Sequence, residues 1–174
     1  GVIKLGTDLK IAMFDQKRDI LSDDLSLWSV LSGHSELGKS NKNDYIMVQN
    51  QPRHILSYLK NFLFTREQVY GNVRELSGGE KSRLLLAILM AKPSNVLVLD
   101  EPTNDLDLET LDLLKEVISS YSGTVIFVSH DRSFVDTIAS HTLLLQEGRP
   151  IIIHAGGFSD FWHTVPKLGK QKKC

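Results

Sequence analysis

The segment 76–80, with the sequence LSGGE, has the residue types of a phosphate-binding helix start. Ser77 is a favoured N-cap residue and Glu80 follows three positions later, which predicts a capping box. Gly78 and Gly79 allow backbone N–H groups to approach a ligand closely, and N–H groups at a helix N-terminus attract anions. A capped helix that binds nothing is the ordinary alternative, so the segment alone leaves both interpretations open.

Two adjacent carboxylates, Asp100 and Glu101, follow the apolar run 96–99. The run predicts a buried strand whose carboxyl end carries both acids, and open α/β sheets bind ligands at that end. Asp100 has the chemistry to hold Mg²⁺, directly or through water. Glu101 has the chemistry to polarise an attacking water. The alternative is a strand that ends in a solvated acidic turn.

Three further candidates carry weaker signals when each is taken alone. Asp107 is predicted to N-cap the helix that follows it. His130 follows the apolar strand predicted at 124–128, where an imidazole can donate a hydrogen bond to a terminal phosphate. Gln16 follows the first predicted strand, 9–14, and is a candidate ligand for Mg²⁺ or water. A structural or solvated role is the simpler interpretation of each residue alone.

Strands and helices alternate along the predicted framework, which indicates an α/β fold with part of its sheet parallel and covered on its faces. Strands are predicted at 9–14, 45–48, 95–99, 124–128, 142–146 and 151–154. Helices or helical turns are predicted at 24–31, 52–62, 65–70, 77–91, 107–120 and 131–139, with Pro52 opening the second of these. The polar segment 32–44 is predicted to be a loop.

Composition narrows the function classes. The chain has 174 residues and a formal net charge of −1, which excludes a globally basic nucleic-acid binder and suits one globular domain. The longest apolar run, 84–91, is far shorter than the ~20 residues of a transmembrane helix, and the N-terminus lacks the apolar core of a signal peptide. One cysteine, Cys174, cannot form an internal disulfide, so a cytoplasmic location is expected.

Taken together and in this order, the motifs resemble those of the ATP-binding cassette (ABC) ATPases over nearly the whole chain. The resemblance matches 76–80 to the ABC signature, 96–101 to the Walker B strand, 104–107 to the D-loop, His130 to the switch histidine and Gln16 to the Q-loop. The sequences of segments 100–107 and 129–132 are similar to the corresponding segments of the ABC-F branch of twin-cassette ATPases. Five further segments of this chain resemble the second cassette of the Uup-type members of that branch: 5–7, 14–16, 53–59, 91–95 and 156–160.

The resemblance implies a fold: a P-loop NTPase-like mixed sheet covered by helices, with a small helical subdomain and an incomplete N-terminus. The partial nucleotide-binding domain would span 1–166 and be followed by a basic tail at 167–174. Within it, 25–70 would lead into the helical subdomain with the signature at 76–80, and 92–156 would carry the Walker B, D-loop and H-loop core.

The resemblance also implies Mg²⁺-dependent hydrolysis of ATP. Glu101 would orient or deprotonate the water, His130 would stabilise the γ-phosphate, and Asp100 and Gln16 would manage Mg²⁺. A second cassette would present its nucleotide to the signature and the D-loop, contacted by Ser77, Gly78, Gly79, Glu80 and Asp107. The implied partners are that second cassette and the ribosome, which would be contacted through rRNA or tRNA. The resemblance also allows association with DNA, and it implies no membrane partner.

A P-loop string, G-x-x-x-x-G-K-S, does occur at 33–40. We interpret it as a chance match, because no buried strand precedes it and no apolar-faced helix follows it. It also lies after Gln16, whereas the family has its P-loop before the Q-loop. The chain is therefore expected to begin after the P-loop helix, to be inactive as an ATPase alone, and to leave the strand 96–99 short of a neighbour.

Two alternatives stay open. An ATP-binding subunit of a membrane transporter would share the same motif chemistry, although the sequence NDLD at 104–107 disfavours this interpretation. A non-catalytic relic or interaction fragment is compatible with the same ancestry.

Two structural expectations follow from the main interpretation: Asp100 and His130 should lie close together, and the signature residues 77–79 should be exposed and face away from Asp100 and Glu101.

Overall fold

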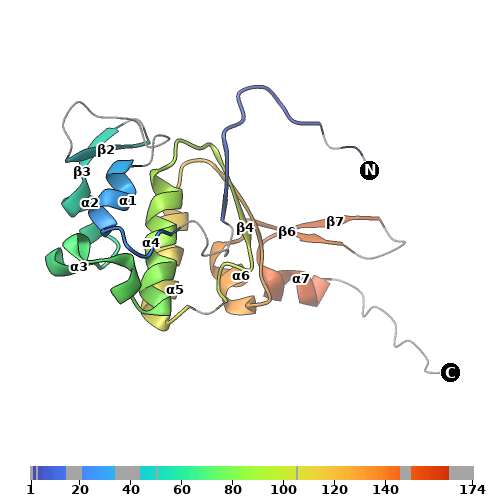
Figure 1. Cartoon of the computed structure of the whole chain (residues 1–174). Helices are drawn as coiled ribbons and strands as arrows, with labels where there is room; N and C mark the ends of the chain where they lie inside the picture. Colours follow the sequence, from blue (N-terminus) through green and yellow to red (C-terminus); the bar gives the residue numbers. More distant parts are fainter. Residues whose placement is uncertain are drawn as a thin grey trace. The chain divides into compact units, whose positions relative to one another are not determined.

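The computed structural model describes residues 2, 4–14, 21–33, 44–49, 51–104, 106–145 and 150–164, of which 162–164 are described as backbone only. Gln16 and the positions 34–40 of the P-loop-like string lie outside the described residues. The chain divides into two compact units, Gly1–Val128 and Ser129–Cys174. Each unit is described by itself (Figure 1), and the single domain expected over 1–166 stays a prediction.

A three-stranded parallel sheet forms the centre of the first unit. It consists of β1 (Ile11–Phe14), β4 (Val96–Asp100) and β5 (Thr124–Val128), in the order β1-β4-β5. The expectation that the strand 96–99 lacks a neighbour is wrong, because Leu97 pairs with Ala12 on one side and with Val125 on the other. The outer edges of this sheet belong to β1 and β5 instead.

Asn95 joins the amino ends of all three strands. Its side chain accepts a hydrogen bond from the Lys10 backbone N–H at 2.8 Å and donates one to the Asp8 carbonyl at 2.8 Å. Its own carbonyl accepts from the Thr124 N–H at 3.0 Å. This fixes the register of β4 against both neighbours, so that the opposite ends of the strands, which carry Asp100 and Glu101, are set as well.

The two faces of the sheet differ in burial. Side chains alternate between the faces along a strand, and the face of Leu97 and Leu99 is buried, with 0% and 2% of each residue exposed. On the other face Met13, Ile126 and Val128 are 66%, 56% and 58% exposed. The expectation that both faces are covered therefore holds for one face only within the described residues.

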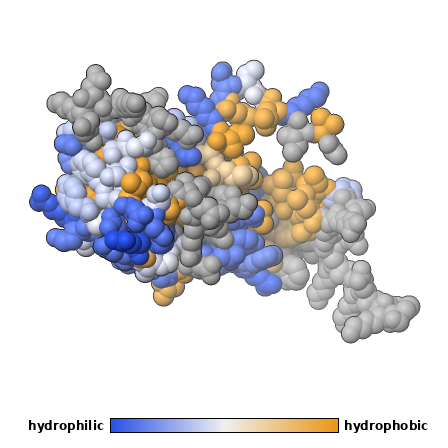
Figure 2. Space-filling view, in the orientation of Figure 1, coloured by the Kyte–Doolittle hydropathy of each residue, from blue (hydrophilic) through white to orange (hydrophobic). Residues whose placement is uncertain are grey.

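Helices and a short hairpin fill the segment between β1 and the signature. They are α1 (Leu27–Gly33), β2 (Tyr45–Val48), β3 (Gln51–His54), α2 (Ile55–Lys60), α3 (Arg66–Tyr70) and the 3₁₀ turn η3 (Val73–Glu75). α1, α2 and α3 contact one another, and most of their apolar side chains are buried. Figure 2 shows hydrophilic residues over much of the visible surface of these helices.

Pro52 does not open a helix, contrary to the expectation from the sequence. It lies in β3, paired with Met47 of β2 in an antiparallel hairpin, and α2 begins three residues later. The Ile55 N–H donates to the Asp44 carbonyl at 2.9 Å, which makes 44 and 55 a hydrogen-bonded pair. Since such pairs alternate along an antiparallel ladder, Pro52 falls at a position where no N–H is needed.

α4 (Gly78–Ala91) is the central helix of the first unit. Every residue from 82 to 91 is buried, so the helix is surrounded on all sides. The Tyr58 hydroxyl of α2 donates to the Ala87 carbonyl at 2.7 Å. α5 (Leu108–Ser119) packs against α4 with an apolar face that includes Leu113, Leu114 and Ile118. Among the described helices none is long and apolar enough to cross a bilayer.

The second unit pairs an antiparallel hairpin with two short helices. Its elements are α6 (Arg132–Ile138), β6 (His141–Leu144), β7 (Ile152–Ala155) and α7 (Phe158–Thr164), and the last was not expected from the sequence. Asp136 of α6 accepts hydrogen bonds from the Ser159 N–H at 2.8 Å and the Ser159 hydroxyl at 2.6 Å. These bonds fasten α7 to α6.

Candidate functional site

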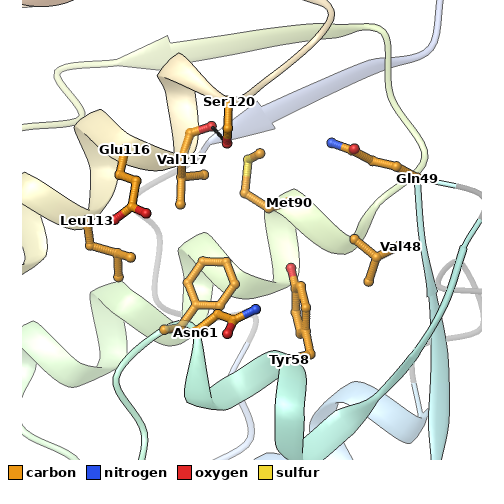
Figure 3. A pocket seen from close by; sticks show the side chains of 10 residues that line it. Val48, Gln49, Tyr58, Asn61, Met90, Leu113, Glu116, Val117 and Ser120 are labelled. Atoms are coloured by element: carbon orange, nitrogen blue, oxygen red, sulfur yellow. Dashed lines mark hydrogen bonds between the residues drawn. The ribbon is translucent and has the colours of Figure 1, made fainter.

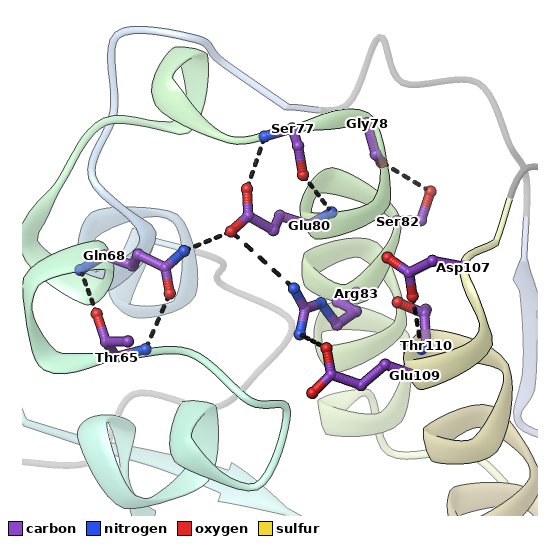
Figure 4. Close-up of polar contacts among 10 residues, drawn as sticks. All are labelled: Thr65, Gln68, Ser77, Gly78, Glu80, Ser82, Arg83, Asp107, Glu109 and Thr110. Carbon is purple, nitrogen blue, oxygen red and sulfur yellow. Dashed lines mark hydrogen bonds and ion pairs between the residues drawn. The ribbon is translucent and has the colours of Figure 1, made fainter.

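The start of α4 has the capping box that the sequence predicts. The Ser77 hydroxyl accepts from the Glu80 N–H at 3.3 Å, and the Glu80 carboxylate accepts from the Ser77 N–H at 2.7 Å (Figure 4). Ser77 and Gly78 are exposed and Gly79 is half-buried. The N–H groups of Gly78 and Gly79 have no acceptor within the described part of the chain. This turn therefore offers hydrogen-bond donors at the surface.

Asp107 lies directly against the signature turn. A Cβ placed on Gly79 would come within 2.7 Å of the Asp107 Oδ2, so only glycine allows this approach without a shift. The other carboxylate oxygen accepts from the Thr110 N–H at 2.7 Å, which confirms Asp107 as the N-cap of α5. Residues from two motifs, 28 positions apart, thus form one surface with Ser77 and Gly78.

Both acids of this surface are held in the charged form. The backbone N–H and the hydroxyl of Ser77 lower the pKa of Glu80, with Gln68 and Arg83 adding to the effect. The side chain and backbone N–H of Thr110 lower the pKa of Asp107. Carboxylates at helix N-termini are also favoured by the helix dipole. A phosphate group at this surface would meet exposed N–H donors and two negative charges, so it needs a counter-charge from elsewhere.

Asp100 and Glu101 stand at the carboxyl end of β4, as predicted. Asp100 is exposed, and Glu101 adopts a left-handed backbone conformation with φ of 44°. That conformation is uncommon for a residue with a long side chain and costs about 1 kcal/mol. The Glu101 N–H donates to the Val128 carbonyl at 2.9 Å, and the Glu101 carbonyl accepts from the Asn104 N–H at 3.1 Å. These two bonds hold the strained turn in place.

The structure does not bring the whole predicted site together. Gln16 lies outside the described residues. His130 is exposed and belongs to the second unit, just before Asp131, the N-cap of α6, so its proximity to Asp100 stays a prediction. Gly33, the first residue of the P-loop-like string, is the last residue of α1. A functional P-loop follows a strand, so this context agrees with a chance match.

Arg83 belongs to the same region, although none of the sequence motifs includes it. It is 8% exposed, and its guanidinium makes ion pairs with Glu109 at 3.6 Å and with Glu80 at 4.0 Å (Figure 4). The same guanidinium lies over the Phe64 ring, 5.7 Å from its centroid. A sequence signal existed: an arginine three positions after the capping glutamate, at the start of an apolar helix.

A separate pocket lies near the other end of α4, about 20 Å along the helix axis from the signature turn. Figure 3 shows Tyr58 and Met90 on one side and the α5 residues Leu113, Glu116 and Val117 on the other. Its volume is about 480 Å³, and it is lined by Val48, Gln49, Tyr58, Asn61, Phe62, Met90, Leu113, Glu116, Val117 and Ser120. No predicted site residue lines this pocket.

Comparisons with known proteins agree with the motifs. The family model described as ABC transporter matches residues 6–104. The ATP-binding protein Uup of Caulobacter vibrioides is 43% identical over 99% of this chain and 27% of its own length, and Uup of Escherichia coli K12 is 49% identical over 92% and 24%. The energy-dependent translational throttle protein EttA of Haemophilus influenzae is 37% identical over 92% and 28%. The chain spans about a quarter of these relatives.

Proposed function

The chain belongs to the ABC family, and from that premise we propose that it forms part of an ATP-binding cassette of the ABC-F branch. In this proposal the surface made by Ser77, Gly78, Gly79 and Asp107 faces an ATP held by a second cassette. The observation that carries the proposal is the contact between Gly79 and Asp107 beside exposed N–H groups. It places two motifs, each weak alone, on one outward surface.

The charges of this surface support binding in trans. Glu80 and Asp107 are both negative, so a free phosphate gains little from the helix dipole there. A nucleotide that arrives with cations of its own cassette has that repulsion already neutralised. The exposed donors of Gly78 and Gly79 then add hydrogen bonds to phosphate oxygens. We therefore assign these residues to ATP binding only in the presence of the partner cassette.

The carboxyl end of β4 is proposed to serve a second nucleotide, with Asp100 and Gln16 at Mg²⁺, Glu101 as the group that orients or deprotonates water, and His130 at the γ-phosphate. The described residues hold no cluster of three or more candidate metal ligands. Asp100 nonetheless fits Mg²⁺, which binds through one or two carboxylates together with phosphates and water. Bound Mg²⁺ would supply neutralisation of phosphate charge. The strained backbone of Glu101 supports a functional role for this residue.

The biological setting is proposed from the relatives. EttA is named as an energy-dependent translational throttle protein. We extend this to a cytoplasmic role in which ATP-driven closure of two cassettes acts on the ribosome, through rRNA or tRNA.

The proposal is tested by mixing the 174-residue chain with a P-loop-bearing cassette from a Uup relative and measuring association by analytical ultracentrifugation. We expect association only with ATP and Mg²⁺. Ser77→Arg should weaken it about tenfold or more, because the new side chain blocks a desolvated contact. The control Ser119→Arg, on the exposed end of α5, should leave it unchanged. ATP-independent association, or equal affinities for both variants, would contradict the proposal.

A further inference from the structure

Arg83 occupies an unusual position between two helix starts. Only 10% of its side chain is exposed, and Figure 4 shows its guanidinium between Glu80 of α4 and Glu109 in the first turn of α5. Its Nε has no acceptor among the described residues. A buried charge is costly unless it is paired, so the position of Arg83 depends on both carboxylates at once.

Each of these carboxylates sits beside a cap of the proposed nucleotide surface. Glu80 closes the capping box with Ser77. Glu109 lies two residues after Asp107, the N-cap of α5, on the same helical turn. A movement of Arg83 therefore changes the surroundings of both helix starts. Among the described residues, no other ion pair joins the start of α4 to the start of α5.

A second support fixes Glu80 from the opposite side. The Gln68 amide donates to the Glu80 carboxylate, while its carbonyl accepts from the Thr65 N–H at 3.0 Å. Thr65 and Gln68 form the capping box of α3, so the Gln68 side chain links this capping box to that of α4. Glu80 is held in one orientation, with an oxygen directed towards Arg83 (Figure 4).

We propose that Arg83 is a positioning residue that holds the signature turn and Asp107 in one fixed geometry, so that both face the same ATP presented by a partner cassette. This inference rests on the proposed function, which it deepens by naming the residue that joins the two motifs. Arg83 itself touches no nucleotide in this scheme. It acts through Glu80 on residues 77–79 and through Glu109 on Asp107.

The charges agree with this role. Hydrogen bonds from Ser77 account for most of the lowering of the Glu80 pKa, and those from Thr110 for most of the lowering at Asp107, but Arg83 contributes to both. One cation thus acts on acids of two separate caps. Lys81, the neighbouring cation of α4, pairs instead with Asp23 at 3.0 Å and offers a matched control.

The first test is amide hydrogen exchange in the chain without ATP. The N–H groups of Ser77 and Thr110 donate to Glu80 and Asp107, so each reports one cap. Arg83→Met should speed exchange at both amides by about tenfold, Arg83→Lys should restore part of the protection, and Lys81→Met should change neither. Acceleration at one amide alone, or at neither, would overturn the proposal.

Glu109→Gln guards against a failure of Arg83→Met to fold, because Glu109 is 67% exposed and its loss leaves the core intact. Glu109→Gln should speed exchange at the Thr110 amide. In the double variant with Arg83→Met it should speed that exchange by less than it does alone, because both substitutions remove the same ion pair. Full additivity would contradict the scheme. An NMR pH titration should also show the pKa of Asp107 rising in Arg83→Met and returning with lysine, a response that loss of packing alone does not give.

The last arm separates this proposal from the proposed function. ATP-dependent association with the P-loop-bearing cassette should fall about tenfold in Arg83→Met and stay unchanged in Lys81→Met. If the parent chain does not associate at all, the proposed function fails, and the role of Arg83 towards ATP fails with it. If the parent chain associates and Arg83→Met associates equally well, the positioning role alone is wrong.

Discussion

The start of α4 and the end of β4 place acidic side chains in two different kinds of local structure. At α4 the backbone is regular, and Glu80 and Asp107 accept hydrogen bonds at 2.7 Å from nearby N–H groups. At β4 the backbone turns into a left-handed conformation at Glu101. The first arrangement is stabilised by its own contacts, whereas the second contains strain that the surrounding sheet has to hold.

The surroundings of the two regions differ in the same way. α4 is buried along most of its length, and its start lies against α5. The sheet that carries Asp100 and Glu101 is buried on one face, while Met13, Ile126 and Val128 on the other are largely exposed. We infer that the signature surface is ready to bind as it stands and that the β4 edge depends more on what covers it.

The largest expected effect concerns the two faces of the sheet. Leu97→Ala should lower the free energy of unfolding by about 2–5 kcal/mol, because it leaves a cavity under the helices. Ile126→Ala, on the exposed face, should cost less than about 1 kcal/mol. Urea unfolding followed by circular dichroism measures both values. Similar losses for the two variants would show that the second face is covered as well.

A smaller effect is expected from the contact between Gly79 and Asp107. Gly79→Ala gains helix propensity but displaces the carboxylate that caps α5, so the two effects of about 1 kcal/mol should nearly cancel. In an Asp107→Ala background the clash is gone, and the same substitution should stabilise the chain by ~0.5–1 kcal/mol. A double-mutant cycle in urea measures this coupling. Equal effects of Gly79→Ala in both backgrounds would mean that the two residues do not touch.

The strain at Glu101 predicts a gain of stability. Glu101→Asn should raise the free energy of unfolding by up to about 1 kcal/mol, because asparagine tolerates the left-handed conformation. Asp100→Asn, one residue earlier, should have no such effect. Thermal unfolding of the two variants gives the comparison. A loss of stability in Glu101→Asn would argue that the side chain, rather than the backbone, dominates this turn.

The smallest effect is a pH dependence at the α4 start. The pKa values of Glu80 and Asp107 are lowered by hydrogen bonds in the folded chain, so both acids stabilise it fully above their ordinary pKa. That contribution is lost as the pH falls below about 4, through the lowered values. Glu80→Gln with Asp107→Asn should therefore flatten the decline of stability in acid. Glu116→Gln, an exposed acid outside both caps, is the control, and an identical slope in the double variant would contradict the assignment.

Local patterns predicted the α4 start well. A serine followed by a glutamate three residues later forms a capping box from backbone geometry alone, and it is present. Asp107 as an N-cap is local in the same sense. Arg83 was missed because its role depends on α5 lying beside α4, a contact between residues 26 positions apart. Spacing within α4 points to the pair with Glu80, but it does not reveal the partner Glu109 in α5.

The errors at the sheet have the same origin. Pro52 was assigned to a helix because proline suits the first turn, but pairing with β2 decided its conformation. The strand 96–99 was expected to be short of a neighbour, but β4 lies between β1 and β5 and has neighbours on both sides. The left-handed backbone of Glu101 has no sequence signal, because glutamate rarely adopts it.

The central claim, that residues 77–79 bind an ATP held by a partner cassette, is tested most directly by hydrogen exchange at the N–H groups of Gly78 and Gly79. Both amides should exchange rapidly in the chain alone, because no described residue accepts from them. With a P-loop-bearing cassette, ATP and Mg²⁺ together, their exchange should slow at least tenfold, by the order of one new hydrogen bond. Slowing with the partner but without ATP, or association with ATP that leaves both amides unprotected, would contradict the claim.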